Sequence, residues 1–125
     1  MIIKDIIRSD FKALNVKDSI DIALDLMDNL KVNGMPVLDD DKNLVGMVVK
    51  ADIYRFMIQP GHYDTYPVEL IMSKSVIIAN SDEDVITIAN RLRKNDIVAM
   101  PVVENNKLLG LITIEDILDY FIKEN

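Results

Sequence analysis

The chain contains the same sequence pattern twice. Met35-Pro36-Val37 recurs 65 residues later as Met100-Pro101-Val102, and Gly46–Asp52 recurs 64 residues later as Gly110–Asp116. A repeat of this length is a complete supersecondary unit. The sequence therefore predicts a molecule with pseudo-two-fold symmetry, in which the functional clefts lie where the two copies meet.

The length of the chain indicates that the two copies share one core. A repeat of this size alone would bury only about 60% of the surface that its unfolded chain exposes, and the whole chain has 125 residues. Gln59–Pro67 contains Pro-Gly and a second proline, which break regular structure. We place the boundary there, with the first repeat at residues 1–61 and the second at residues 62–125, which together form one domain.

Hydrophobic periodicity predicts the same order of elements in each copy, which is strand, helix, strand, strand, helix. The fold class is therefore α/β, with two β-α-β-β-α repeats packed with pseudo-two-fold symmetry. Asp18 or Ser19 is expected to cap the first helix, and Ser81 is suited to cap its counterpart. In the first copy we expect strands at 11–14, around 35–37 and at 44–49, with helices at 19–31 and 51–58. In the second copy we expect strands at 76–79, around 100–102 and at 108–113, with helices along the stripe 85–92 and at 114–122.

Composition excludes several classes of protein. The net charge of −7 argues against nucleic-acid binding, and no apolar stretch approaches the roughly 18 to 20 residues that cross a bilayer, so we expect neither nucleic acid nor membrane insertion. The N-terminus lacks the pattern of a secretory signal and the chain has no cysteine. The expected location is the cytoplasm.

Few residues are suited to catalysis. His62 is the single histidine, and it has no cysteine or second histidine with which to form a metal site or a nucleophilic dyad. The carboxylates of Asp39–Asp41 belong to a polar turn, where we expect them to be solvated rather than to have raised pKa values. We therefore expect no enzymatic activity, no metal site and no required cofactor.

Two interpretations fit Thr113-Ile114-Glu115-Asp116, where an apolar strand ends and a helix begins. In the structural one, Thr113 caps the helix by accepting from the N–H of Glu115 or Asp116, and Asp116 reaches back. In the functional one, the helix start attracts a phosphate while the aspartate accepts from ribose hydroxyls. Capping alone explains Asp52 less well, because its copy has Val49 where the second copy has Thr113.

The ordered set of motifs resembles the cystathionine-β-synthase (CBS) domain, twice over nearly the whole chain. Each copy has an entry segment (Lys4–Ile7 and Val68–Met72), an alanine-containing helix, Met-Pro-Val, and then a glycine, apolar residues and the aspartate motif. The resemblance implies a stand-alone CBS pair, or Bateman module, which binds adenosyl ligands between its copies and commonly dimerises.

In that family each cleft combines the adenine pocket of one copy with the ribose and phosphate motif of the other. The resemblance implies that Thr113 contacts phosphate and Asp116 the ribose hydroxyls, with the base against Ile7, Lys12, Val32, Asn33, Gly34 and Pro36. A second cleft would combine Asp52 with Met72, Ser75, Ile77, Ile97, Val98, Ala99 and Pro101. Because Val49 cannot donate or accept there, the second cleft should bind about tenfold more weakly.

Two functions remain as hypotheses. The leading one is a regulatory module that binds AMP, ADP, ATP or S-adenosylmethionine and transmits binding as a change of conformation or association. The alternative is a non-catalytic dimerisation or docking scaffold with vestigial clefts. The partners expected under the first hypothesis are the adenosyl ligand, a second copy of the chain and an effector protein of unknown identity.

Overall fold

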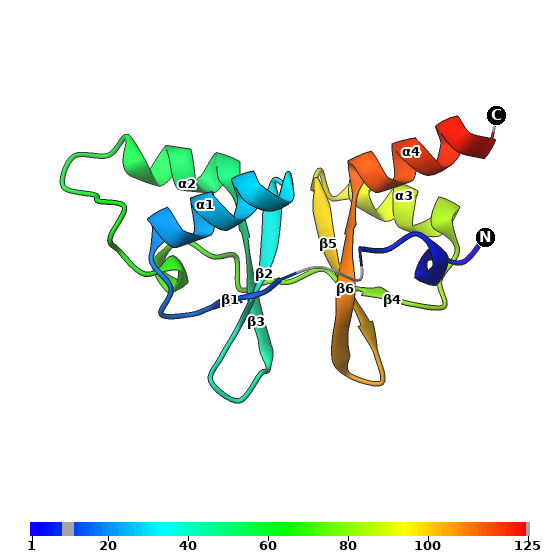
Figure 1. The fold of residues 1–125 in the computed structure, drawn as a ribbon, viewed down its shortest axis with the longest axis horizontal. Coiled ribbons are helices and arrows are strands. Elements are labelled where there is room, and N and C mark those ends of the chain that lie inside the picture. Colours follow the sequence, from blue (N-terminus) through cyan, green and yellow to red (C-terminus); the bar gives the residue numbers. More distant parts are fainter. Residues whose placement is uncertain (9–11, 125) are drawn as a thin grey trace. The chain divides into compact units, whose positions relative to one another are not determined.

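Two three-stranded sheets organise the part of the chain that the structure describes, which is residues 1–8 and 12–124 of a computed structural model (Figure 1). Their strand orders are β1-β2-β3 and β4-β5-β6. Each sheet combines one parallel pair with one antiparallel hairpin. The chain divides into two compact units, in which the described residues 1–8 and 77–124 form unit 1 and residues 12–76 form unit 2.

Unit 2 follows the predicted order of elements. Its core consists of buried apolar side chains from β2, β3 and both helices, among them Met27, Met35, Val48 and Ile53. Phe11, which we placed in the first strand, lies outside the described residues. The elements are β1 (Leu14–Asn15), α1 (Ile20–Leu30), β2 (Gly34–Leu38), β3 (Leu44–Val49), α2 (Lys50–Met57) and the short 3₁₀ helix η2 (Val68–Leu70).

Unit 1 repeats this order around its own core. One cluster of buried side chains joins the sheet, both helices and Ile3 near the N-terminus. The elements are η1 (Ile3–Asp5), β4 (Ala79–Asn80), α3 (Val85–Lys94), β5 (Ala99–Glu104), β6 (Lys107–Thr113) and α4 (Ile114–Glu124). The expectation of an α/β fold with two β-α-β-β-α repeats is confirmed.

The segment that begins each repeat packs on the sheet of the other repeat. Ile3 is fully buried in the core of unit 1, and Arg8 forms an antiparallel bridge with Leu111 of β6. Figure 1 shows this N-terminal segment in dark blue, within unit 1. Ser73 forms the corresponding bridge with Met47 of β3 in unit 2. We call residues 1–8 and the segment around Ser73 the exchanged segments. They divide the structure at points other than residues 61 and 62, so the repeat boundary there stays a prediction.

The two glycines of the repeated motif lie where these segments cross the sheets. A Cβ at Gly110 would lie 2.6 Å from the Arg8 carbonyl oxygen, and one at Gly46 would lie 2.6 Å from Met72 Sδ and 3.0 Å from the Ser73 carbonyl oxygen. These distances are shorter than van der Waals contact. Close approach of the backbone therefore requires glycine at position 110, whereas at Gly46 the shortest contacts would be with the flexible Met72 side chain.

The caps and turns explain smaller differences between the copies. Asp84, and not Ser81, is the N-cap of α3 and accepts from the Ile86 N–H, while the buried Ser81 donates to Glu104. Asn105 and Asn106 form a two-residue turn with positive φ at both positions, which suits a tight hairpin. The longer first turn, 39–43, accounts for the change of repeat offset.

Candidate ligand-binding site

The turn between β6 and α4 is held by a reciprocal pair of hydrogen bonds. The Asp116 N–H donates to Thr113 Oγ1 at 3.1 Å, and the Thr113 N–H donates to Asp116 Oδ2 at 2.8 Å. The structural interpretation of this motif, a capping box, is thus confirmed. Thr113 is only 2% exposed and the Asp116 side chain 12%. The Asp116 carboxylate is therefore largely covered and is bonded within this turn.

Arg8 contacts this turn from a distant part of the chain, and the sequence analysis did not predict this contact. Its Nε lies 3.1 Å from Asp116 Oδ1 and 3.3 Å from Oδ2, so the guanidinium pairs with the same carboxylate that caps the turn. The two residues are 108 positions apart. The only signal in the sequence is that the second copy has Ser73 at the position of Arg8, and that difference alone does not place a charge at the turn.

The corresponding turn in unit 2 is built differently. Val49 is the N-cap of α2 and no side chain caps it. Asp52 turns to its own helix instead and accepts from Arg55 Nη1 at 2.8 Å. Its side chain is 34% exposed, against 12% for Asp116. The two aspartates therefore differ in both their partners and their accessibility.

The residues that precede each Met-Pro-Val lie beside the helix start of their own unit. Val98 accepts a hydrogen bond from the N–H of Ile114, the first residue of α4, and Ala99 pairs with Thr113 in the sheet. Asn33 accepts in the same way from Lys50, the first residue of α2. These backbone contacts place the apolar segments of each copy next to that copy's aspartate turn.

Each of the two predicted sets is divided between the units. In the first set, unit 1 contributes Thr113, Asp116 and the half-buried Ile7, and unit 2 contributes Lys12, Val32, Asn33, Gly34 and Pro36. Lys12 and Asn33 are exposed and the other three are buried. In the second set, unit 2 contributes Asp52, Met72 and Ser75, and unit 1 contributes Ile77, Ile97, Val98, Ala99 and Pro101. Ser75 and Val98 are exposed.

A groove of about 880 Å³ lies along α3. It is lined by Ile77, Thr87, Asn90, Arg91, Arg93, Lys94 and Asn95. No carboxylate belongs to this lining, so the groove is basic although the chain as a whole is acidic. Of the residues that we placed in the second cleft, Ile77 is the one in this groove.

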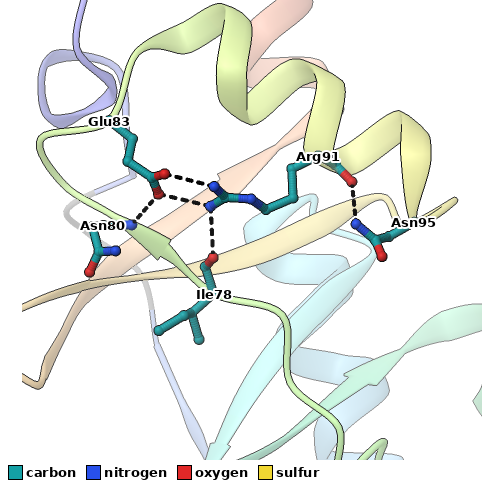
Figure 2. A network of polar contacts seen from close by, with 5 residues as sticks. All are labelled: Ile78, Asn80, Glu83, Arg91 and Asn95. Carbon is teal, nitrogen blue, oxygen red and sulfur yellow. Dashed lines mark hydrogen bonds and ion pairs between the residues drawn. The ribbon is translucent and has the colours of Figure 1, made fainter.

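Arg91, in the last turn of α3, belongs to a polar network with Glu83, which precedes that helix, and with the Ile78 carbonyl (Figure 2). Its Nη1 and Nη2 donate to Glu83 Oε2 and Oε1 at 2.8 and 2.7 Å, and Nη1 also donates to the Ile78 carbonyl at 3.1 Å. The hydrogen bonds from Arg91 hold the pKa of the Glu83 carboxyl below its ordinary value, more than its partial burial raises it. Arg91 is therefore committed to a structural pair.

His62 and the acidic turn have partners within unit 2. The His62 ring stacks on Phe56 with centroids 3.9 Å apart, and its Nδ1 lies 2.8 Å from the Phe56 carbonyl oxygen. Asp39 accepts backbone and side-chain hydrogen bonds from Asn43, which lower the pKa of its carboxyl. Within residues 1–8 and 12–124, no three His, Cys, Asp or Glu side chains are grouped so that they could hold a metal ion.

Comparison with known proteins identifies the class of domain that this fold and its turns define. The CBS domain family matches the chain at residues 3–59 and again at residues 68–123. The chain belongs to the CBS domain family and is a tandem CBS pair.

Solved structures agree with this assignment. The CBS domain pair of protein MJ0100, in complex with 5′-methylthioadenosine and S-adenosyl-L-methionine, has a TM-score of 0.89 and 28% identity, and the match covers 100% of this chain and 98% of that one. The CBS domain protein TA0289 from Thermoplasma acidophilum has a TM-score of 0.86 and 29% identity, over 96% of this chain and 68% of that one.

Curated relatives are longer proteins. A homoserine O-acetyltransferase from Methanohalobium evestigatum is 30% identical over 92% of this chain and 23% of its own length. An inosine-5′-monophosphate dehydrogenase from Methanocaldococcus jannaschii is 28% identical over 94% of this chain and 22% of its own length. The chain thus spans under a quarter of these two relatives. Among the described residues, no helix combines the length and apolar character needed to cross a bilayer.

Proposed function

We propose that this CBS pair is a regulatory module that binds an adenosyl ligand and transmits binding as a change of conformation or association. The ligand is AMP, ADP, ATP or S-adenosylmethionine. The observation that carries the proposal is the β6–α4 turn, where a largely covered aspartate and a hydroxyl residue begin a helix. The similarity over the whole chain to a CBS pair that was solved with two adenosyl compounds supports it.

In this proposal the ribose hydroxyls bind Asp116 and a phosphate binds near Thr113. The base lies against the unit 2 residues of the first set and Ile7. The second set, with Asp52, forms a weaker site because Val49 offers no hydroxyl. A ligand regulates such a module only through different affinities for its alternative states. Binding therefore raises the population of the state that binds the ligand more tightly, and the effector protein responds to this change. The module acts in the cytoplasm, and no catalytic step is part of this function.

Isothermal titration calorimetry tests the proposal directly. We expect heat of binding with at least one of AMP, ADP, ATP, S-adenosylmethionine and methylthioadenosine. Asp116→Asn keeps an oxygen for the Thr113 N–H but removes the charge, and it should weaken that binding by about tenfold or more, because hydrogen bonds to charged groups contribute about 1.5 to 3 kcal/mol. Asp52→Asn is the matched variant and should have a smaller effect on the tightest site.

Two results would contradict the proposal. One is the absence of heat with all five compounds when circular dichroism shows a folded protein. The other is an unchanged affinity in Asp116→Asn.

We propose in addition that two copies of the chain associate through α2 and α4. Large apolar side chains are exposed at equivalent positions of the two helices. These are Tyr54 on α2, Ile58 at the C-cap of α2, and Leu118 and Ile122 on α4, which are 54%, 77%, 56% and 63% exposed. Arg55 on α2 is equivalent to Asp119 on α4, so the two helix faces carry opposite charges at this position. This complementarity favours pairing of α2 with α4 of a second copy.

Analytical ultracentrifugation tests the association. The parent chain should sediment as a dimer, and Ile58→Glu or Ile122→Glu should shift it to monomer without loss of helix content. The scaffold alternative, with vestigial clefts, is favoured instead if the chain dimerises and none of the five adenosyl compounds binds.

A further inference from the structure

Arg8 is the feature of the β6–α4 turn that the CBS motifs do not account for. Its backbone is fixed to β6, because the Arg8 N–H donates to the Leu111 carbonyl at 3.0 Å and its own carbonyl lies against Gly110. From this fixed point the side chain reaches Asp116, and it is 31% exposed. The backbone thus holds the Arg8 side chain at the turn, beside Asp116.

The same position in unit 2 has no charge. Ser73 is fixed to β3 by the equivalent bridge, in which the Ser73 N–H donates to the Met47 carbonyl at 2.8 Å. Its short neutral side chain leaves Asp52 to pair with Arg55, whose side chain is 70% exposed. The two sites therefore differ by one fixed guanidinium, in addition to the difference between Thr113 and Val49.

The pairing with Arg8 limits what Asp116 can still accept. A carboxylate offers about four acceptor positions. Asp116 Oδ2 already receives the Thr113 N–H, and Arg8 Nε lies within 3.3 Å of both oxygens. A ribose diol donates two hydrogen bonds, so it competes with Arg8 for these positions. A guanidinium that leaves a carboxylate loses a charged partner unless the ligand supplies another anion.

We propose that Arg8 makes the Asp116 site selective for phosphorylated adenosyl ligands, and this inference rests on the adenosyl-binding function proposed above. When the ribose hydroxyls bind Asp116, the Arg8 guanidinium moves from the carboxylate to the phosphate of the same ligand. AMP compensates for the broken ion pair in this way, whereas adenosine does not. The Asp52 site has no such group and does not distinguish the two compounds through it.

The test compares AMP with adenosine by calorimetry, in the Asp52→Asn background so that the Asp116 site is observed. The parent protein should bind AMP about tenfold or more tightly than adenosine, as expected for a charge-assisted hydrogen bond. Arg8→Met keeps the aliphatic stem and should lose most of this preference, with AMP binding more weakly and adenosine more tightly. Arg8→Lys should retain part of the preference, because the charge remains.

Arg55→Met in the same background is the matched control, since it removes the guanidinium that belongs to the Asp52 turn. It should leave the ratio of the two dissociation constants as in the parent. The preference for AMP should also fall as the salt concentration is raised, because the Arg8 side chain is partly exposed and salt screens its charge.

The outcomes separate this inference from the function on which it rests. The inference is overturned if Arg8→Met has the same ratio of dissociation constants as the parent, which includes the case in which both compounds bind the variant more tightly by the same factor. Failure of the parent to bind any adenosyl compound overturns the proposed function, and the selectivity with it.

Discussion

Thr113 and Val49 occupy equivalent positions at the starts of α4 and α2, and they provide a matched pair of variants. Thr113→Val leaves the Asp116 N–H without its acceptor and should lower the free energy of unfolding by about 1 kcal/mol. Val49→Thr places a hydroxyl at an extended N-cap position, with φ −118° and ψ 150°, and should raise stability by up to about the same amount. Urea denaturation measures both changes, and equal signs for the two would contradict the capping argument.

The pair of Glu83 and Arg91 predicts a dependence of stability on pH. Hydrogen bonds from Arg91 lower the pKa of Glu83, so the pair stabilises the fold above the ordinary glutamate pKa of 4.5 and this contribution is lost as the pH falls through the lowered pKa. Glu83→Gln should therefore lower the melting temperature at pH 7 and reduce its fall on acidification. Thermal melts from pH 7 to pH 3 measure this. Glu69→Gln, at an exposed position of unit 2, is the control, and a parallel shift of the two variants would argue against the pair.

For single residues, the sequence predicts contacts between residues that are close in the chain and misses contacts between residues that are far apart in it. The bonds between Thr113 and Asp116 span three residues, so spacing on a helix was sufficient to anticipate them. Arg8 meets Asp116 across 108 residues, and no periodicity or spacing contains that information. The placement of the adenosyl ligand stays a prediction for both sets of residues.

The crossing of the N-terminal segment over β6 predicts an unequal effect of the same substitution in the two sheets. Gly110→Ala brings its Cβ against the Arg8 carbonyl, which is backbone, and should destabilise by about 1 to 3 kcal/mol. At Gly46 the nearest atoms belong to the flexible Met72 side chain, so Gly46→Ala should cost less. Guanidinium chloride denaturation compares the two, and a larger cost at Gly46 would contradict the close approach.

Elements were predicted well where hydrophobic periodicity is long and less well where pairing is short. The four helices and the hairpin strands begin and end within about two residues of the expected positions. Each is long enough for its apolar pattern to repeat several times in the sequence. The strand expected at 76–79 is only Ala79–Asn80, since the chain pairs with β5 over two residues. Ser81 was a plausible cap by composition, but Asp84 lies next to the first helical residue and takes the role.

For the molecule as a whole, the exchanged segments predict that the N-terminus contributes to the stability of unit 1. Ile3 is fully buried in that core, so Ile3→Ala should lower the free energy of unfolding by about 2 to 5 kcal/mol. Val68, also fully buried, is its equivalent in unit 2, and Val68→Ala should cost less because fewer buried carbons are removed. Urea denaturation measures both, and a neutral effect of Ile3→Ala would mean that the N-terminal segment does not pack as described.

The exchange itself could not be anticipated from the sequence. Repeat analysis finds units that are continuous in the chain, and both entry segments look like the beginnings of their own repeats. Their buried side chains are apolar in either arrangement, so composition does not choose between packing on one sheet and packing on the other. The two glycines are the one trace of the crossing, and they are equally compatible with ordinary turns.

Because Ile3 packs among residues 77–124, unit 1 cannot be completed until the ribosome has made these residues as well. Unit 2 is continuous from residue 12 to residue 76 and can form earlier during translation. Residues 1–8 are thus synthesised before unit 2 but can reach their final place only after it, and their apolar side chains remain unprotected in the interval.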